Sequence, residues 1–105
     1  MTEFGNKFHR GQVIHHKLFD YRGVIVDVDQ TFQLPEEWYE TVARSCPPKD
    51  QPWYHVLVHR TAHPTYVAER NLESDPSKQA VEHPLLDQIF DKFSDGFYSN
   101  SLEEN

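Results

Sequence analysis

Histidine is the over-represented reactive residue of this sequence, with seven copies in 105 residues. Its imidazole ring can bind a metal ion or exchange a proton near neutral pH. His15 and His16 are adjacent and would point to opposite faces of a strand, whereas His55 and His59 would lie about 13 Å apart on one strand. Neither pair can chelate one ion. A cross-strand site that joins His15 or His16 to His55 or His63 stays open, but polar residues on strand faces are the favoured interpretation.

Two aspartates, Asp27 and Asp29, offer a second kind of chemistry because they lie two residues apart and would share one strand face. Paired carboxylates can act as acid and base, but no apolar segment evidently flanks this pair to raise a pKa, so a solvated strand face is favoured. Cys46 is the only cysteine, which excludes an internal disulfide, and the four glycines are too scattered for a phosphate-binding loop. We therefore predict a protein with no enzymatic activity, no cofactor and no bound metal.

The strands that would position these residues form two hairpins. In chain order, the five predicted strands are residues 12–18, 24–29, 53–59, 65–69 and 71–73. Each is rich in β-branched or aromatic residues and is bounded by turn-forming residues. Alternation in the second strand places Val24, Val26 and Val28 on one buried face. In the third strand it places Trp53 and His55 together on one side.

Two hairpins of short strands, too few for a sandwich, indicate a mainly β fold. We predict a small SH3-like β-barrel of about five strands over residues 8–73. A short helix over residues 36–44 would be inserted between the hairpins, because Pro35 suits a first helical turn and two glutamates follow it.

The C-terminal part of the chain is predicted to pack onto this barrel. An acidic linker over residues 74–82 would lead to a helix at about 84–94, with Gly96 just past its end. The expected apolar stripe of the helix comprises Leu86, Ile89, Phe90 and Phe93. The stripe would cover one side or end of the barrel, and a docking role for another protein stays open. We therefore expect one domain over residues 1–105.

The net charge of −7 is distributed unevenly. Residues 1–33 and 53–73 are each neutral, whereas residues 34–52 carry −2 and residues 74–105 carry −5. Such an acidic balance argues against a general nucleic-acid binder and favours basic partners. No run of 18 apolar residues and no apolar N-terminal signal are present, so we predict a soluble cytoplasmic protein without a membrane partner.

Four blocks of the sequence together resemble a known family: GQVIHHKLFDYRGVIVDVD at 11–29, PWYHVLV at 52–58, YVAERNL at 66–72 and EHP at 82–84. Their order and spacing are similar to those of the YccV/HspQ family, also called the hemimethylated DNA-binding domain. The resemblance spans roughly residues 8–98. It implies an SH3-like barrel without enzymatic activity. It also implies two kinds of partner: DNA methylated on one strand, and proteins of the quality-control system, where members act as heat-shock factors that influence an ATP-dependent protease.

For DNA binding, we predict a face made of cations, histidines and aromatic rings. The candidate residues are Arg10, His15, His16, Lys17, Arg22, Trp53, His55, Arg60 and Tyr66. The cations could supply only a few phosphate contacts, and the histidines would add charge only at lower pH, so binding would be weak and salt-sensitive. Recognition of one methyl group would further need an exposed aromatic ring, for which Trp53, Tyr54 or Tyr66 would be a candidate. A core position is the alternative for each of these rings, and it is the favoured one for Trp53.

The alternative is a protein-binding adaptor that modulates an ATP-dependent protease, or binds its clients, without binding DNA. The acidic charge favours this alternative, since it attracts basic partners and repels nucleic acid. Small barrels often bind extended peptides at an edge strand or in an aromatic groove. Assembly into a homo-oligomer stays open.

Overall fold

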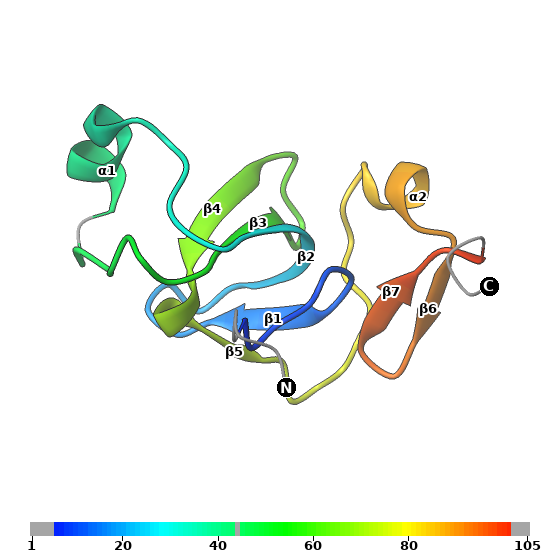
Figure 1. Cartoon of the computed structure of the whole chain (residues 1–105). Helices are drawn as coiled ribbons and strands as arrows, with labels where there is room; N and C mark the ends of the chain where they lie inside the picture. The colour runs from blue at the N-terminus through cyan, green and yellow to red at the C-terminus, as the bar shows by residue number, and fades with distance from the viewer. Residues whose placement is uncertain (1–5, 44, 102–105) are drawn as a thin grey trace.

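An antiparallel sheet of five strands forms the centre of the computed structural model, which describes residues 6–43 and 45–101 (Figure 1). Its strands are β1 (Val13–His16), β2 (Arg22–Asp29), β3 (Trp53–Val58), β4 (Pro64–Ala68) and β5 (Leu72–Ser74), in the spatial order β4-β3-β2-β1-β5. The helix α1 (Glu36–Val42) is inserted between β2 and β3, and the 3-10 helix η1 (Glu69–Asn71) joins β4 to β5. The mainly β fold, the five-stranded sheet and the inserted helix are therefore confirmed.

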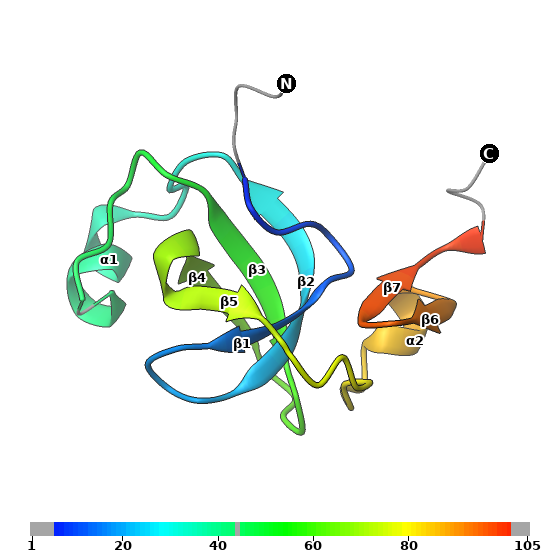
Figure 2. The same cartoon turned by 90° about the horizontal axis from the view of Figure 1, so that it is seen from below.

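The inner face of this sheet holds the main core. Side chains from all five strands meet there in one cluster, so the sheet is strongly bent, as Figure 2 shows from below. The inner core cluster comprises Phe8, Ile14, Ile25, Tyr54, Val56, Val67 and Leu72. β4 and β5 remain the two edges, and no pairing joins them within residues 6–43 and 45–101. The SH3-like barrel therefore stays a prediction.

A β-bulge at Val26 decides which side chains of β2 face inward. Ile25 pairs with Val56, and the neighbouring residue of β3, His55, pairs with Asp27. Val26 is therefore the extra residue of β2 between these two pairs. Such a bulge reverses the alternation of side chains after it. Without the bulge, Val26 would lie opposite His55.

The predicted common face of Val24, Val26 and Val28 is therefore wrong. Val24 and Val26 contact a cluster on the outer face, whereas Val28 packs against the inner core cluster beside Ile25. In the sequence, valines occupy every second position from Val24 to Val28, as in a regular strand. The bulge could not be recognised from this pattern, because every residue involved suits a strand.

The outer face of the sheet carries an apolar cluster at each end. The tail cluster, covered by the C-terminal residues, comprises Val13, Val24, Leu57, Val81, Leu86 and Phe90. The α1 cluster comprises Trp53, Tyr66 and Ala68 of the sheet with Phe32, Leu34, Trp38, Tyr39 and Ala43 of the insertion. Figures 1 and 2 show α1 and the C-terminal hairpin at opposite ends of the molecule.

The predicted C-terminal helix over residues 84–94 is wrong in its extent. The helix α2 covers only Leu86–Ile89, and the chain then forms a hairpin of β6 (Lys92–Ser94) and β7 (Phe97–Ser99). Asp95 and Gly96 form its two-residue turn with φ of 52° and 87°. Positive φ at both positions is what an Asp-Gly turn supplies in a hairpin, so Gly96 forms a strand turn and does not follow a helix.

The residues predicted as an acidic linker are held against the sheet. Asp75 is buried and accepts a hydrogen bond of 2.8 Å from the guanidinium of Arg22, which also donates to the carbonyl oxygens of Gln79 and Ala80. The hairpin docks at Gly11, where the Tyr98 N–H donates to the Gly11 carbonyl at 2.7 Å. Gly11 has a φ of +93°, and an added Cβ would lie 2.0 Å from the Tyr98 carbonyl oxygen, so only glycine fits.

Candidate functional site

An apolar groove lies between α1 and the turn that joins β1 to β2, beside the edge strand β4. We call it the α1 groove. It encloses about 360 Å³, and its walls include Leu18, Phe19, Tyr21, Trp38, Val42 and Tyr66. A cavity of this size with aromatic walls is typical of a site that binds a small group or a short chain segment.

Stacked aromatic rings build the floor of the α1 groove. The rings of Trp53 and Tyr66 stack with centroids 5.2 Å apart, and Trp38 meets them edge-on at 6.1 and 5.7 Å. The Trp53 indole N–H donates to the Pro48 carbonyl at 3.1 Å, and the Tyr39 hydroxyl donates to the Pro47 carbonyl at 2.7 Å. These contacts fix α1, which is short and lacks a side-chain cap at its N-terminus.

Large apolar side chains at the rim of the groove are exposed to water. Leu18, Phe19 and Val42 are 58%, 73% and 53% exposed. Burying such side chains against a partner gains about 25 cal/mol for each Å² of apolar surface removed from water. The rim is therefore the strongest candidate contact surface of this groove.

His16 shapes the turn that carries Leu18 and Phe19. Its buried Nδ1 accepts hydrogen bonds of 3.1 Å from the N–H groups of both residues, and its ring stacks on Phe19 with centroids 4.7 Å apart. Burial lowers the pKa of His16, so the ring stays neutral and can accept these bonds. The structure thus places His16 in a positioning role, and it supplies no positive charge at the surface.

The cations of the predicted binding face lie mostly beside the tail. Arg22 is paired with Asp75, Arg60 with Glu82 at 3.3 Å, and Arg10 lies over the ring of Phe90 at 4.8 Å. Acidic partners neutralise Arg22 and Arg60, which leaves them less charge for a phosphate.

Two further polar residues of that face, His15 and Lys17, lie near the β1–β2 turn. His15 contacts Asp20 and Glu73 at 2.7 Å each, and hydrogen bonds to these carboxylates raise its pKa. Lys17 is exposed, and its backbone N–H donates to the Asn71 carbonyl. The cross-strand site of His15 with His55 is not formed, since His15 uses both ring nitrogens on these two acids and His55 contacts Asp29.

The structure brings together the other three predicted residues. Trp53 and His55 both contact the ring of Tyr66, at centroid distances of 5.2 and 4.7 Å, so their predicted common side is confirmed. Trp53, Tyr54 and Tyr66 are 1%, 0% and 8% exposed, so the favoured core position of Trp53 is confirmed and none of the three is the exposed ring that contact with a methyl group would need. Trp53 and Tyr66 line the α1 groove as parts of its floor.

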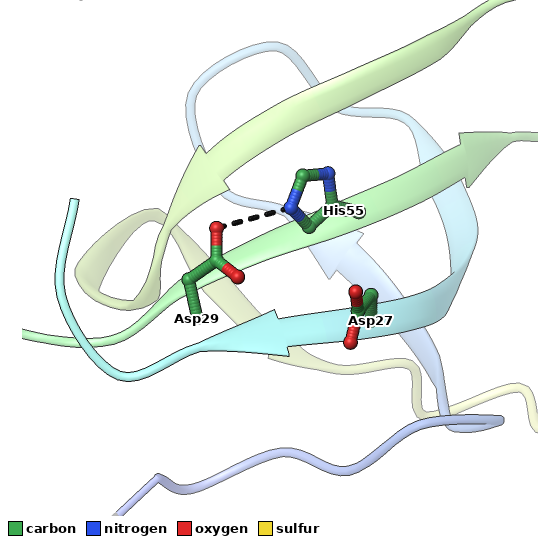
Figure 3. A group of neighbouring side chains, drawn as sticks. All are labelled: Asp27, Asp29 and His55. Atoms are coloured by element: carbon green, nitrogen blue, oxygen red, sulfur yellow. Dashed lines mark hydrogen bonds and ion pairs between the residues drawn. The ribbon is translucent and has the colours of Figure 1, made fainter. Parts of the chain in front are cut away.

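A cluster of polar side chains lies on the outer face between the two apolar clusters. His55 Nε2 lies 3.1 Å from Asp29 Oδ2, and the Tyr66 hydroxyl donates to the same oxygen at 2.7 Å. Burial and the Asp29 carboxylate raise the pKa of Tyr66, so the hydroxyl keeps its proton and stays a donor. Asp27 lies beside this pair on β2 (Figure 3). Tyr66 therefore connects the cluster to the floor of the α1 groove.

The predicted binding face missed most of the groove lining, including the large apolar side chains of Leu18, Phe19, Trp38 and Val42. Phe19 carried a usable signal, because a large apolar residue stands in a predicted turn, where polar residues are usual. Leu18 was placed at the end of the predicted strand 12–18, whereas β1 ends at His16. Trp38 and Val42 were placed on one face of a helix, but local spacing does not show what that face meets.

The comparison with known families gives one match over most of the chain. The family model described as hemimethylated DNA-binding protein YccV like matches residues 6–96. The match begins before β1 and ends at the turn between β6 and β7, so it includes the sheet, the inserted helix and most of the tail. In the part of the chain that the structure describes, no helix combines the length and apolarity that crossing a bilayer requires.

Proposed function

The chain belongs to the YccV-like family of hemimethylated DNA-binding-type modules, and on that premise we propose that it is a non-enzymatic binding module that holds its partner in the α1 groove. One observation carries this proposal: Leu18, Phe19 and Val42 expose large apolar surfaces around a cavity with an aromatic floor. Isolated exposed apolar residues are common on proteins, but three around one groove indicate a contact surface.

DNA methylated on one strand is the partner that the family favours. Aromatic side chains can stack on a base that has turned out of the helix, and an apolar wall can contact its methyl group. The exposed Lys17 and Arg70 lie beside the groove, because the Lys17 N–H donates to the carbonyl of Asn71 and the Arg70 guanidinium donates to that of Ser45. Asn71 and Ser45 both line the groove. Two cations supply few phosphate contacts, so the methylated base must provide much of the affinity.

The test compares duplexes that carry N6-methyladenine or 5-methylcytosine on neither, one or both strands. Fluorescence anisotropy at two salt concentrations measures each Kd. We expect the hemimethylated duplex to bind about tenfold more tightly than the unmethylated one, and Phe19→Ser to remove that preference. Phe97→Ser is the matched control, because Phe97 is also an exposed aromatic residue but lies on the tail hairpin. Equal binding of all three duplexes would reject methylation-specific binding.

An apolar segment of a protein is the second candidate, and the charge of the chain favours it. The net charge is −7, and Arg22, Arg60 and Lys49 are paired with acids, so the surface repels nucleic acid. β4 is an edge of the described sheet and lines the groove from Thr65 to Ala68. An extended peptide could pair with this edge and place its side chains in the groove.

The second candidate is tested with purified ATP-dependent proteases. We expect the full chain to change the degradation rate of model substrates, and Phe19→Ser to abolish that change while Phe97→Ser preserves it. An unchanged degradation rate with the wild-type chain would remove the adaptor role. The two tests are independent, because the DNA-binding assay contains no protease and the degradation assay contains no DNA.

A further inference from the structure

We propose that Asp27, Asp29 and His55 form a binding site for one divalent transition-metal ion of the zinc class. One carboxylate oxygen from each aspartate and one ring nitrogen of His55 all lie within 4.8 Å of one another. Figure 3 shows the three side chains on the same face of the sheet, from the neighbouring strands β2 and β3. The inference does not depend on which partner occupies the α1 groove.

The backbone of the sheet creates this arrangement. Asp27 is the cross-strand partner of His55, and Asp29 follows two residues later on the same face. Only the bulge at Val26 sets this register, because regular pairing would bring a valine opposite His55. Beyond the bulge, the pairing is regular from Asp27 to Asp29, and paired strands support a metal site more rigidly than loops do.

Neighbouring groups orient two of the three ligands. The Tyr66 hydroxyl donates to Asp29 Oδ2, and the Val28 N–H donates to Asp27 Oδ1 at 2.9 Å. The His55 ring also packs on Tyr66 with centroids 4.7 Å apart. Hydrogen bonds of this kind, from residues around the ligands, fix ligand orientation and raise metal affinity in known sites.

The distances suit one ion after small side-chain rotations. Two atoms bound to the same ion at about 2.0–2.2 Å lie roughly 3.0–3.5 Å apart. The contact of His55 Nε2 with Asp29 Oδ2 is 3.1 Å, so this pair already has the required separation. Asp27 is exposed and can turn toward the pair, since its side chain is not packed in a core.

The charges of the cluster also favour a cation. Two carboxylates lie together, and within residues 6–43 and 45–101 their ion pairs are limited to the contact of Asp29 with His55. A divalent ion would balance both charges. One imidazole with two carboxylates and open positions for water suits zinc, cobalt or nickel, whereas magnesium and calcium prefer ligands that are all oxygen.

The test is isothermal titration calorimetry of the untagged full chain with zinc chloride, supported by the absorption spectrum of bound Co²⁺. We expect one Zn²⁺ per chain and a change in the visible spectrum of Co²⁺ on binding. Asp27→Asn and His55→Asn should each weaken zinc binding by about tenfold or more. Asp27 is exposed, so its variant is expected to fold like the wild type, and circular dichroism checks this.

His15→Asn is the matched control. His15 also lies between two carboxylates, but Asp20 and Glu73 contact opposite nitrogens of its ring, so the three groups do not converge on one point. Its removal should change the zinc Kd by less than twofold. The proposal is overturned by absence of stoichiometric binding at 100 µM zinc, by equal effects of His15→Asn and His55→Asn, or by equal affinity for Mg²⁺.

Discussion

The two ends of the outer sheet face each carry an apolar cluster, mainly aliphatic at the tail end and mainly aromatic at the α1 end, and within the described residues only the α1 end has a groove with an exposed apolar rim. At the tail end, Val81, Leu86 and Phe90 from the C-terminal residues cover Leu57 and its neighbours, and all are buried. At the α1 end, the floor is buried but Phe19 and Val42 at the rim are exposed. The tail therefore completes the core, whereas the insertion leaves a surface for a partner.

The difference arises from how each covering segment is held. The tail is fixed by an ion pair between Arg22 and Asp75, by the backbone bond at Gly11 and by its own hairpin. By contrast, α1 has seven residues, no fully buried side chain and no side-chain cap. It is held by ring contacts with Trp53 and Tyr66, by the Tyr39 hydroxyl bond to the Pro47 carbonyl and by an exposed ion pair of Glu36 with Lys49, so we expect α1 to open more easily than the tail.

The largest effect should come from removing an aromatic ring at the sealed end. Phe90→Ala is expected to reduce the free energy of unfolding by about 3–5 kcal/mol, because it leaves a cavity in the tail cluster. Phe19→Ala at the open end should change it by less than about 0.5 kcal/mol, since that ring is in water. Urea denaturation followed by tryptophan fluorescence measures both. Equal losses would show that the α1 groove is part of the core.

The next effect concerns the ion pair that anchors the tail. Burial raises the pKa of Asp75, but hydrogen bonds from Ser77 and Arg22 outweigh burial and hold the pKa below 3.8. A lowered pKa in the folded state stabilises the protein above pH 3.8, and this stabilisation is lost as the pH falls through the folded pKa. Asp75→Asn should therefore cost about 2 kcal/mol at pH 7 and progressively less below pH 4.

The control for this prediction is Glu82→Gln. Glu82 also pairs with an arginine, Arg60, but both side chains are about 70% exposed. Its removal is expected to cost no more than about 0.5 kcal/mol at any pH. Thermal unfolding between pH 2 and pH 7 compares the two variants. A loss at Asp75→Asn that does not depend on pH would contradict the role of its charge.

A smaller and local effect is expected at the open end. Trp38→Ala removes two edge-on ring contacts from α1 and should lower the local stability of residues 36–42 by about 1 kcal/mol. Amide hydrogen exchange should accelerate within α1 and stay unchanged in β3. If exchange accelerates equally in both elements, α1 and the sheet unfold as one unit and the two ends do not differ as we infer.

The smallest effect concerns the turn that forms one wall of the groove. Hydrogen bonds to Asp20 and Glu73 raise the pKa of His15 above 6.5. A raised pKa stabilises the folded state fully below pH 6.5, and this stabilisation is lost as the pH rises through the folded pKa. Replacing both acids by amides should cost about 0.5 kcal/mol at pH 6 and nothing at pH 9. In this double variant, an NMR titration of His15 should show a pKa closer to 6.5 than in the wild type.

Local pattern was sufficient where neighbouring residues decide the structure. The hairpins around 24–29 and 53–59 were predicted because β-branched and aromatic residues alternate between turn formers. Local pattern was insufficient at the tail. The spacing from Leu86 to Phe93 suits a helix, but α2 ends at Ile89 and the Asp95–Gly96 turn then joins two short paired strands. Leu86 and Phe90 pack into the tail cluster, as two residues of the predicted stripe would. Their packing was therefore predictable, although the length of the helix was not.

By itself, the sequence determined the strand-rich fold, the two hairpins, the inserted helix and the family, because these depend on short-range patterns of residue type and on their order. The tertiary structure decided which side chains meet. The bulge at Val26 places Asp27 opposite His55, and the packing of α1 against the β1–β2 turn opens a groove beside Phe19. Both arrangements depend on contacts between residues far apart in the chain, and no local pattern records the register of a distant strand.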